Sequence, residues 1–398
     1  MTDIYLDHNA TTPVDPAVLD AMLPFLREAY GNPSSAYPLG RRSRDAVETA
    51  RAEVAALIGA EPDEIVFVSG GTEASNMAIR GAAVARPDRR GVVTTSIEHP
   101  ATEECCRLLE RAGHPVRRVA PDPDGRVAAA AVSEAIDDTT ALVTIIHAQN
   151  EIGTLQPVEA VSAAARPRGV LVHADAAQSL GKVAVDVDAL GVDLLTIAGH
   201  KLYAPKGIGA LYVRRGVALP PLLAGAGQEH GRRPGTENVA FMVGLGAACR
   251  IAAARQDADA IRIGALAGQL LVELQRAVPD LVLVGHPDAR LPNTLNLLFP
   301  GVSGRALLAA CPQVLASTGS ACHADSEEPS AVLTALGIDR DAALGAVRLS
   351  LGRATTAADV EAAADHLAAA WRGLRTHAPA AASDASAAAL SRFTGALS

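Results

Sequence analysis

The chain has 398 residues, of which 49% are hydrophobic, 3% aromatic and 20% charged, a composition typical of a globular protein with one large or two moderate domains. Its 44 acidic residues outnumber its 35 basic ones, and the formal charge is −9. With no long basic run, this balance argues against a nucleic-acid-binding protein, so small molecules or proteins are the expected partners.

The N-terminus and the cysteines indicate the compartment. MTDIYLDHNATTP lacks a basic region followed by an apolar one, and no stretch is apolar enough to cross a membrane, so we expect a cytoplasmic protein with no membrane partner. The five cysteines are an odd number without C-x-x-C spacing. We therefore predict a reducing compartment, at least one unpaired thiol and no metal site.

Short runs rich in Val, Ile and Leu alternate with Ala-rich stretches long enough for helices. Such runs are typical of buried strands in a mostly parallel sheet, which predicts an α/β fold. Each run ends in a polar cluster, and ligands of open α/β sheets bind beyond the carboxyl ends of the strands, so the five ends should converge on one pocket. The runs are IVFVSGG (65–71), VVTTSIEH (92–99), ALVTIIHAQN (141–150), VLVHADAAQ (170–178) and DLLTIAGHK (193–201).

The texture of the sequence changes near residue 250, where a long helical stretch leads into further short strands and a last amphipathic helix near 357–374. We therefore predict a large domain over 1–255 and a smaller α+β domain over 256–375 that carries the loop around Cys322. The N-terminal segment is expected to pack on the small domain. The Ala/Ser-rich stretch 376–398 is expected to be a flexible tail.

The first polar strand ends suggest a site for an anion. SGGTEASN (69–76) places small residues and a hydroxyl at a strand-to-helix junction, where backbone N–H groups favour phosphate. An ordinary Ser/Thr helix cap is the alternative, and no Walker A pattern follows. His99 and His200 also end strands, where a histidine is either structural or part of the site.

Asp175 and Lys201 are the main candidates for chemistry. A carboxylate at the end of a buried strand needs a partner such as a protonated pyridine nitrogen, although Asp175 could also cap a following helix. Lys201 emerges from an apolar strand, so partial desolvation would make it a candidate Schiff-base nucleophile, the alternative being a surface lysine at a strand end. Gly207 and Gly209 open a predicted hairpin after it.

Cys322 lies in ASTGSACHADSEEPSA (316–331), among small, flexible and charged residues. A cysteine is more often a small buried hydrophobe, so this setting favours a reactive thiol. His323 follows it directly, but adjacent side chains of an extended chain point in opposite directions, and His323 is left without a role.

The motifs together resemble the pyridoxal-phosphate-dependent cysteine desulfurases, of the class V aminotransferase family, and their close kin, the selenocysteine lyases. The resemblance covers residues 3–374 and implies a fold-type I pyridoxal-phosphate-dependent transferase. The motifs that carry it are YLDHNATTP, GNPSS, SGGTEASN, IEHPA, NEIG, HADAAQSLGK, GHKLYAPKGIGALYVRR, RPGTEN, LPNTLN, STGSACH and VRLSLGR.

The resemblance implies a role for each matched residue. Lys201 would hold pyridoxal 5'-phosphate covalently, Asp175 would pair with the ring nitrogen, Gln178 would contact the ring hydroxyl, and His99 would stack on the ring. Gly71, Thr72 and His200 would hold the phosphate, and Thr236 would reach the phosphate of a second subunit, which implies a homodimer. Asn150 would lie beside the cofactor, and Asn32, Asn150 and Arg348 would bind the carboxylate of the substrate. For Arg348 a structural ion pair is the alternative.

The implied reaction converts L-cysteine to L-alanine, with Cys322 taking the sulfur as a persulfide for an acceptor protein, such as an iron–sulfur scaffold or a tRNA-thiolation enzyme. A selenocysteine lyase is the second reading, favoured by Gly71, the ACH sequence and Ala198, which replaces a serine common in desulfurases. Pro100 matches neither branch. A nucleotide-binding or scaffold protein is a third reading, disfavoured because no G-x-G-x-x-G follows a strand.

Overall fold

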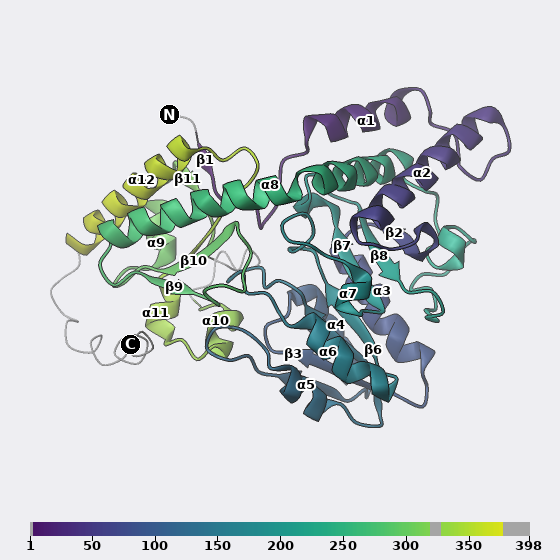
Figure 1. Ribbon diagram of the computed structural model, residues 1–398, viewed down its shortest axis with the longest axis horizontal. Helices are drawn as coiled ribbons and strands as arrows, with labels where there is room; N and C mark the ends of the chain where they lie inside the picture. The colour runs from purple at the N-terminus through teal and green to yellow at the C-terminus, as the bar shows by residue number, and fades with distance from the viewer. Residues whose placement is uncertain (1–2, 319–327, 377–398) are drawn as a thin grey trace.

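The computed structural model describes residues 3–318 and 328–376. A seven-stranded sheet with helices on both faces forms one part, and a smaller three-stranded sheet with its own helices forms the other. One long helix, α8 (Val239–Ala277), runs along both parts (Figure 1). The α/β fold with a mostly parallel central sheet and a smaller C-terminal part is confirmed.

The central sheet is parallel except for one strand. β8 is antiparallel to both of its neighbours, β2 and β7, so β2 and β7 share one direction, and the remaining strands pair in parallel with β7 or its neighbours. The antiparallel β7–β8 pair agrees with the predicted hairpin. The order is β2 (Ile65–Val68), β8 (Gly209–Val213), β7 (Leu194–Ala198), β6 (Leu171–Asp175), β5 (Thr140–Ile146), β3 (Gly91–Thr95) and β4 (Val116–Val119).

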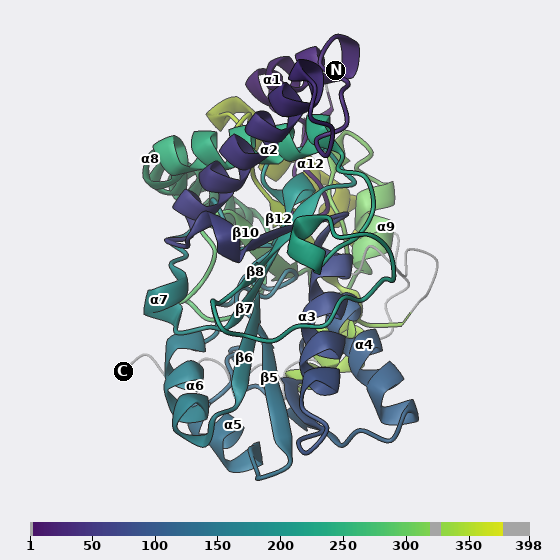
Figure 2. The same cartoon turned by 90° about the vertical axis from the view of Figure 1, so that its right-hand side faces the viewer.

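The strands are buried on both faces, which explains their continuous apolar runs. In β2, Ile65 and Phe67 enter one apolar core while Val66 and Val68 enter another, as the two-residue period of a strand requires. Helices α3 (Gly71–Ala85) and α4 (Pro100–Arg111) cover one face. On the other face lie α5 (Ala129–Ala135), α6 (Val158–Ala165) and α7 (Val187–Leu190) (Figure 2).

Helix α8 joins the two parts. Its first half packs against α1 (Pro16–Arg27) and α2 (Pro38–Leu57), and its second half against α12 (Ala357–Thr376). Ala252 belongs to the core of the large part, whereas Ile263 belongs to the core of the small part. The division that we propose between residues 255 and 256 therefore falls inside a continuous helix, between two residues that serve different cores.

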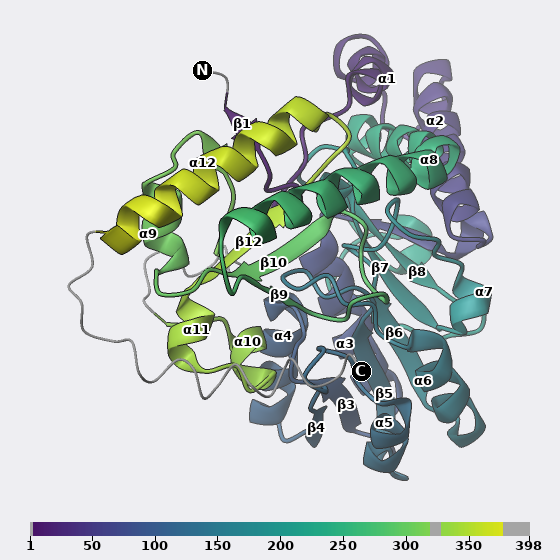
Figure 3. The same ribbon diagram turned by 60° about the vertical axis from the view of Figure 1, so that its left-hand side comes forward.

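The smaller part includes the first described strand of the chain. β1 (Ile4–Tyr5) pairs in parallel with β11 (Val314–Leu315), and Ile4 and Leu6 are buried in the core that also holds Trp371. The segment after β1 then crosses from the small part to the large one (Figure 3). The other elements are the antiparallel strands β12 (Ala346–Ser350), β10 (Thr294–Leu298) and β9 (Val282–Val284), with α9 (Gly304–Ala309), α10 (Ala331–Ala335) and α11 (Arg340–Leu344).

Several elements differ from the sequence prediction. The five predicted strands end earlier than expected, because turns begin directly after the apolar residues. β4 was not predicted, since its sequence VRRV carries two arginines at the edge of the sheet, where polar side chains reach water. Nor were α1 and α2. Residues 319–327 of the loop around Cys322 lie outside the described residues, as does the predicted tail apart from Thr376, which ends α12.

No helix within 3–318 or 328–376 is long and apolar enough to cross a membrane. In the same ranges, no three His, Cys, Asp or Glu side chains gather as metal ligands would.

Candidate active site

Five strand ends meet at one edge of the central sheet. β3, β5, β6 and β7 are parallel, and β2 shares their direction. Their carboxyl ends therefore lie along the same edge, as convergence on one pocket would require. The polar clusters at these ends are residues 69–73, 96–100, 148–151, 173–178 and 198–201.

Asp175, His99 and Lys201 lie close enough to influence one another. Asp175 is the last residue of β6, is 5% exposed, and accepts a hydrogen bond from the Ala177 N–H at 3.0 Å. Burial raises the pKa of the Asp175 carboxyl. The nearby His99 and Lys201 lower this pKa, but burial has the larger effect. No helix follows Asp175, because residues 177–179 form a turn, so the reading of Asp175 as a helix cap is wrong. A buried carboxylate with two basic neighbours is suited to hold a cationic ring nitrogen.

His99 is held in one orientation by the helix that follows it. It is the N-cap of α4, and its Nδ1 accepts a hydrogen bond from the Ala101 N–H at 3.1 Å. In the neutral ring the proton is therefore on Nε2. Burial lowers the pKa of His99, with the Lys201 amine acting in the same direction and Asp175 against them. Pro100 occupies the first helical position, where its missing N–H costs nothing, which gives this unmatched residue a structural reason.

Lys201 ends a short turn after β7 and is half-buried, not a surface lysine. Its Nζ donates hydrogen bonds to the carbonyl oxygens of Asn9 and Ala10, the latter at 2.8 Å. His200 lies beside Thr11 Oγ1 at 3.2 Å, and burial lowers the pKa of His200 to about 4. The N-terminal segment therefore covers the turn that carries the candidate nucleophile.

The start of α3 forms a cradle near the end of β7. Its N-cap is Gly70, which has a φ of +157° and no capping side chain, a conformation that favours glycine. A Cβ on Gly71 would lie 3.2 Å from the Cβ of Ala198, so only a small residue fits at each position. Thr72, next along, is exposed. An uncapped helix start lined by small residues suits a phosphate group.

Gln178 and Asn9 are hydrogen-bonded to each other, and the Asn9 carbonyl also accepts from Lys201. Gln178 Nε2 donates to the Asn9 carbonyl at 2.9 Å, and Gln178 Oε1 accepts from Lys182 Nζ at 2.7 Å. A carbonyl can only accept and an ammonium can only donate, so these two partners define which way the Gln178 amide faces. Asn9 is 1% exposed and also donates to the Asn150 carbonyl at 3.2 Å.

Arg348 and Asn150, both predicted substrate residues, are in contact. Arg348 lies on β12 and is 2% exposed; its Nη1 donates to the Asn150 carbonyl at 3.1 Å. Its Nη2 pairs with Asp7 Oδ1 at 2.7 Å. The ion pair that was the alternative for Arg348 is thus present in the structure, and it leaves the Arg348 guanidinium beside Asn150, in the turn after β5.

Asn32 and Thr236 lie in loops on the surface. Asn32 is exposed between α1 and α2, and its Oδ1 accepts from the Ser34 N–H at 2.9 Å. Thr236 is exposed just before α8. Its loop is held to the large part by an ion pair between Arg233 and Glu73, 3.0 Å apart, at the start of α3. In this single chain the structure does not bring these two residues into the cluster of strand ends.

Cys322 and His323 lie outside the described residues, but the chain on either side is well anchored. Ser317 accepts a backbone hydrogen bond from the Arg348 N–H at 2.7 Å. Ser330 donates to Glu151 Oε2 at 2.5 Å. The segment that holds Cys322 thus begins beside Arg348 and ends beside Glu151, the neighbour of Asn150.

Comparison with known proteins identifies the family. The aminotransferase class-V family model matches residues 4–363. The chain belongs to the aminotransferase class-V family. It is 44% identical over 363 residues to a cysteine desulfurase from Trichormus azollae, with 91% of each chain covered. A NifS-like protein of known structure aligns with a TM-score of 0.87 and 35% identity, over 94% of this chain and 100% of the other.

A second similar protein of known structure is SspA in complex with cysteine, which aligns with a TM-score of 0.77 and 37% identity over 88% of this chain and 99% of the other. Class-V aminotransferases and cysteine desulfurases depend on pyridoxal phosphate. These similarities support a cysteine desulfurase function. The donor set fits that cofactor, since a buried carboxylate, a half-buried lysine and an uncapped helix start lie at one edge of the sheet.

Sequence reasoning missed three polar residues of this class-V site. Asp7, Asn9 and Lys182 contact Arg348, Lys201 and Gln178 respectively, among other partners. All three were part of recognised motifs, YLDHNATTP and HADAAQSLGK. One signal could have found them: each is a polar residue close to an apolar strand, in a motif whose other residues were assigned to the site.

Proposed function

We propose that this chain is a pyridoxal-phosphate-dependent cysteine desulfurase that converts L-cysteine to L-alanine. In this proposal Cys322 takes the sulfur as a persulfide and passes it to an acceptor protein. The observation that carries the proposal is the convergence of Asp175, His99 and Lys201 at the ends of parallel strands along one edge of the sheet, in a chain 44% identical to a cysteine desulfurase over 91% of its length.

The cofactor would be held by residues of the strand-end edge. Lys201 would bond its aldehyde carbon, Asp175 would pair with its ring nitrogen, and His99 would cover the ring face. Gln178 would face the ring hydroxyl, with its amide direction set by Lys182. The phosphate would take the cradle, which in this proposal consists of Gly71, Thr72 and His200 together with Thr236 of a second subunit in a homodimer. When bound, the cofactor supplies an electron sink for loss of the α-proton.

The residues of the chain would then act on the substrate. Arg348, with Asn150 and Asn32, would bind the carboxylate, for which the planar guanidinium is suited. The Lys201 amine would take the α-proton. The Cys322 thiolate would attack the substrate sulfur, so that an S–S bond forms as the C–S bond breaks, and the bonding electrons stay with the substrate carbon, which is protonated to give alanine.

The other thiols support the choice of Cys322. Cys105, Cys106, Cys249 and Cys311 are unpaired and buried. Burial raises the pKa of all four, to about 11 for Cys105. Because the thiolate is the nucleophile, these four are poorly placed to accept sulfur. Cys322, in its polar sequence, is the better candidate.

The proposal is tested with purified full-length protein. We expect it to bind pyridoxal phosphate with the visible absorbance of a lysine-bound cofactor, which Lys201→Ala should lose, and to form alanine from cysteine. Cys322→Ala should keep the absorbance but lose persulfide formation. Full cysteine turnover in Cys322→Ala would show that the persulfide step is wrong, and normal absorbance in Lys201→Ala would show that the cofactor assignment is wrong.

Selenocysteine lyase is the second candidate. It is favoured by two small residues that lie close together, Gly71 and Ala198, since a Cβ on Gly71 would be 3.2 Å from that of Ala198. Comparing alanine formation from selenocysteine and from cysteine separates the two candidates. A preference for selenocysteine that survives Cys322→Ala would favour the lyase. A partner trapped as a mixed disulfide with Cys322 would identify the acceptor.

A further inference from the structure

Glu73 brings a carboxylate to the start of α3, where the proposed function places the phosphate. It is the third residue of the helix, and its Oε2 accepts a hydrogen bond from the Ser69 N–H at 2.6 Å. Ser69 precedes the N-cap residue Gly70, so the Glu73 side chain turns back toward the open end of the helix. The Glu73 carboxylate therefore lies beside the backbone N–H groups that would face an anion.

This helix start carries only half of a capping box. In a full capping box the N-cap side chain accepts from the third helical N–H, while the third side chain reaches back to the N-cap N–H. Gly70 has no side chain to cap with, and a Cβ built on it would meet no described atom within 4 Å. Glu73 supplies the returning half alone, and it does so one residue further back, at Ser69. The helix start is thus open to a ligand, with a carboxylate next to it.

Arg233 is the counter-ion of Glu73. It lies in the loop before α8, and its Nε pairs with Glu73 Oε1 at 3.0 Å. Among residues 3–318 and 328–376, Arg233 is the only basic side chain within 4.0 Å of the Glu73 carboxylate. Burial acts to raise the pKa of Glu73, but the hydrogen bonds from Arg233 and Ser69 outweigh burial and lower this pKa overall. The carboxylate is therefore charged at neutral pH.

Without Arg233, the Glu73 carboxylate would oppose a phosphate at this helix start. A carboxylate in the first turn of a helix is favourable in itself, because it meets the positive end of the helix dipole. A phosphate at the same end would be repelled by that carboxylate. The Glu73 side chain is 13% exposed and that of Arg233 is 25% exposed, so water screens these charges only in part. The Arg233 guanidinium offsets the repulsion.

We propose that Arg233 is a positioning residue for the cofactor phosphate, because it neutralises Glu73 and so lets the start of α3 accept an anion. This inference rests on the proposed function, in which the phosphate lies at that helix start. Arg233 acts through Glu73, without a contact of its own to the phosphate. The alternative is that Arg233 is only a tether for its loop, which also carries Thr236.

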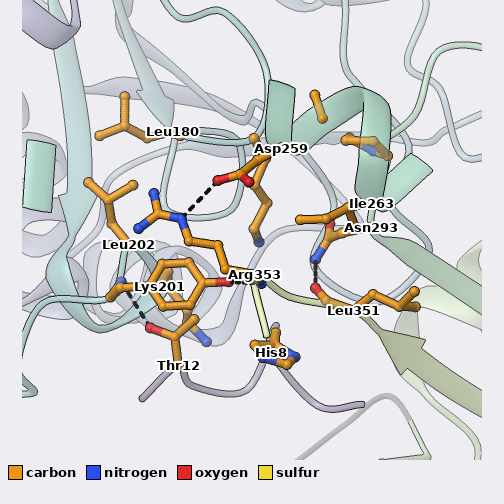
Figure 4. A pocket seen from close by; sticks show the side chains of 15 residues that line it. His8, Thr12, Leu180, Lys201, Leu202, Asp259, Ile263, Asn293, Leu351 and Arg353 are labelled. Carbon is orange, nitrogen blue, oxygen red and sulfur yellow. Dashed lines mark hydrogen bonds and ion pairs between the residues drawn. The ribbon is translucent and has the colours of Figure 1, made fainter. Parts of the chain in front are cut away.

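The lysine that would bond the cofactor aldehyde has different surroundings. Lys201 lines a cavity of about 30 Å³ between the two parts of the molecule, together with residues such as Thr12 and Asn293 (Figure 4), and neither Glu73 nor Arg233 is among the lining residues. Substitutions of the ion pair should therefore change how the phosphate is held without changing the lining around the Lys201 amine. Pyridoxal, which has the same aldehyde but no phosphate, separates the two effects.

The test titrates cofactor-free, full-length protein with pyridoxal phosphate and, separately, with pyridoxal, and follows the visible absorbance of the lysine-bound compound. Arg233→Gln removes the cation, and Glu73→Gln removes the charge but keeps an oxygen that can accept from the Ser69 N–H. A double variant carries both changes. Arg232→Gln is the matched control, since Arg232 lies in the same loop but donates to the Asp63 carbonyl at 3.4 Å. Thermal unfolding checks that each variant is folded.

We expect the Kd for pyridoxal phosphate to rise about tenfold in Arg233→Gln, while the Kd for pyridoxal stays within about twofold of its unsubstituted value. Adding Glu73→Gln should bring the Kd for pyridoxal phosphate back to within about threefold of the unsubstituted value. Glu73→Gln alone should leave this Kd unchanged or lower it. Arg232→Gln should change neither Kd.

A tether without an electrostatic role predicts other results. Arg233→Gln would then raise both Kd values alike, and Glu73→Gln would raise the Kd for pyridoxal phosphate by itself and fail to rescue Arg233→Gln. Any of these results overturns the inference, as does an unchanged Kd for pyridoxal phosphate in Arg233→Gln. If Arg233→Gln does not fold, Glu73→Gln decides alone: a raised Kd overturns the inference, and an unchanged or lowered Kd supports it. No visible absorbance in the unsubstituted protein would instead refute the proposed function.

Discussion

The two walls of the candidate site are built in different ways. The strand-end wall, formed by Asp175, His99 and Lys201, comes from parallel strands of one sheet, whose register is set by backbone hydrogen bonds. The junction wall, formed by Asp7, Asn9, Asn150 and Arg348, comes from distant segments, with Asp7 and Arg348 341 residues apart in the chain. Its members are held together by hydrogen bonds and an ion pair of their side chains.

This difference predicts different responses to substitution. A backbone ladder survives a change of side chain, so a conservative substitution in the strand-end wall should alter chemistry while the geometry stays. In the junction wall the side chain is itself the connection, so a substitution should alter substrate binding and geometry together.

The largest effect is expected for Asp175→Asn. The amide fills the same space and can still accept from the Ala177 N–H, but it cannot stabilise a positive ring nitrogen. Turnover of cysteine should fall about 1,000-fold, equivalent to about 4 kcal/mol in the barrier. The measurement is kcat for alanine formation, with cofactor absorbance as the control for binding. A kcat close to that of the unsubstituted protein would remove Asp175 from the chemistry.

The junction wall is tested by Arg348→Lys. Lysine keeps the charge but loses the planar fork that pairs with a carboxylate. We expect kcat/KM for cysteine to fall about 10- to 100-fold, mainly through KM. Arg372→Lys, on the exposed side of α12, is the matched control and should change nothing. A loss in kcat alone would indicate that Arg348 does not bind the substrate in its ground state.

His173, a buried residue of the strand that carries Asp175, is tested by the pH dependence of folding stability. His173 lies on β6, two residues before Asp175, between Thr144 Oγ1 at 2.8 Å and Thr196 Oγ1 at 2.9 Å. Burial lowers its pKa to about 3. The unfolded chain therefore takes up a proton below about pH 6.5 that the folded protein does not, and stability falls as pH falls.

From this residue we expect a loss of about 2 kcal/mol in the free energy of unfolding between pH 7 and pH 5. His173→Gln, which keeps a donor and an acceptor, should make chemical denaturation less dependent on pH by about that amount. An unchanged dependence in the variant would mean that His173 is already charged in the folded protein.

The smallest effect is expected for Gly71→Ala in the cradle. The added Cβ would lie 3.2 Å from that of Ala198, a contact that a shift of a few tenths of an ångström can relieve. We expect the Kd for pyridoxal phosphate to rise at most about tenfold, measured by titration of the cofactor-free protein. Gly373→Ala, whose Cβ would meet nothing within 4 Å, is the control. A larger loss would show that the cradle is tighter than its neighbours indicate.

The sequence alone determined the strand-end wall. Apolar runs followed by polar clusters predict buried strands, and parallel strands necessarily bring their carboxyl ends to one edge. Asp175, His99 and Lys201 could therefore be placed together from local patterns, and the family motifs added their expected roles.

Only the tertiary structure decided the junction wall. Asn9 and Lys182 lie in turns, where no periodicity marks a partner, and their contacts depend on how the N-terminal segment packs between the two parts of the molecule. The same holds for the Asp7–Arg348 pair. Local sequence encodes local backbone structure, whereas contacts between distant side chains follow from the packing of whole elements. For this reason Asp7, Asn9 and Lys182 were seen in motifs but were given no role.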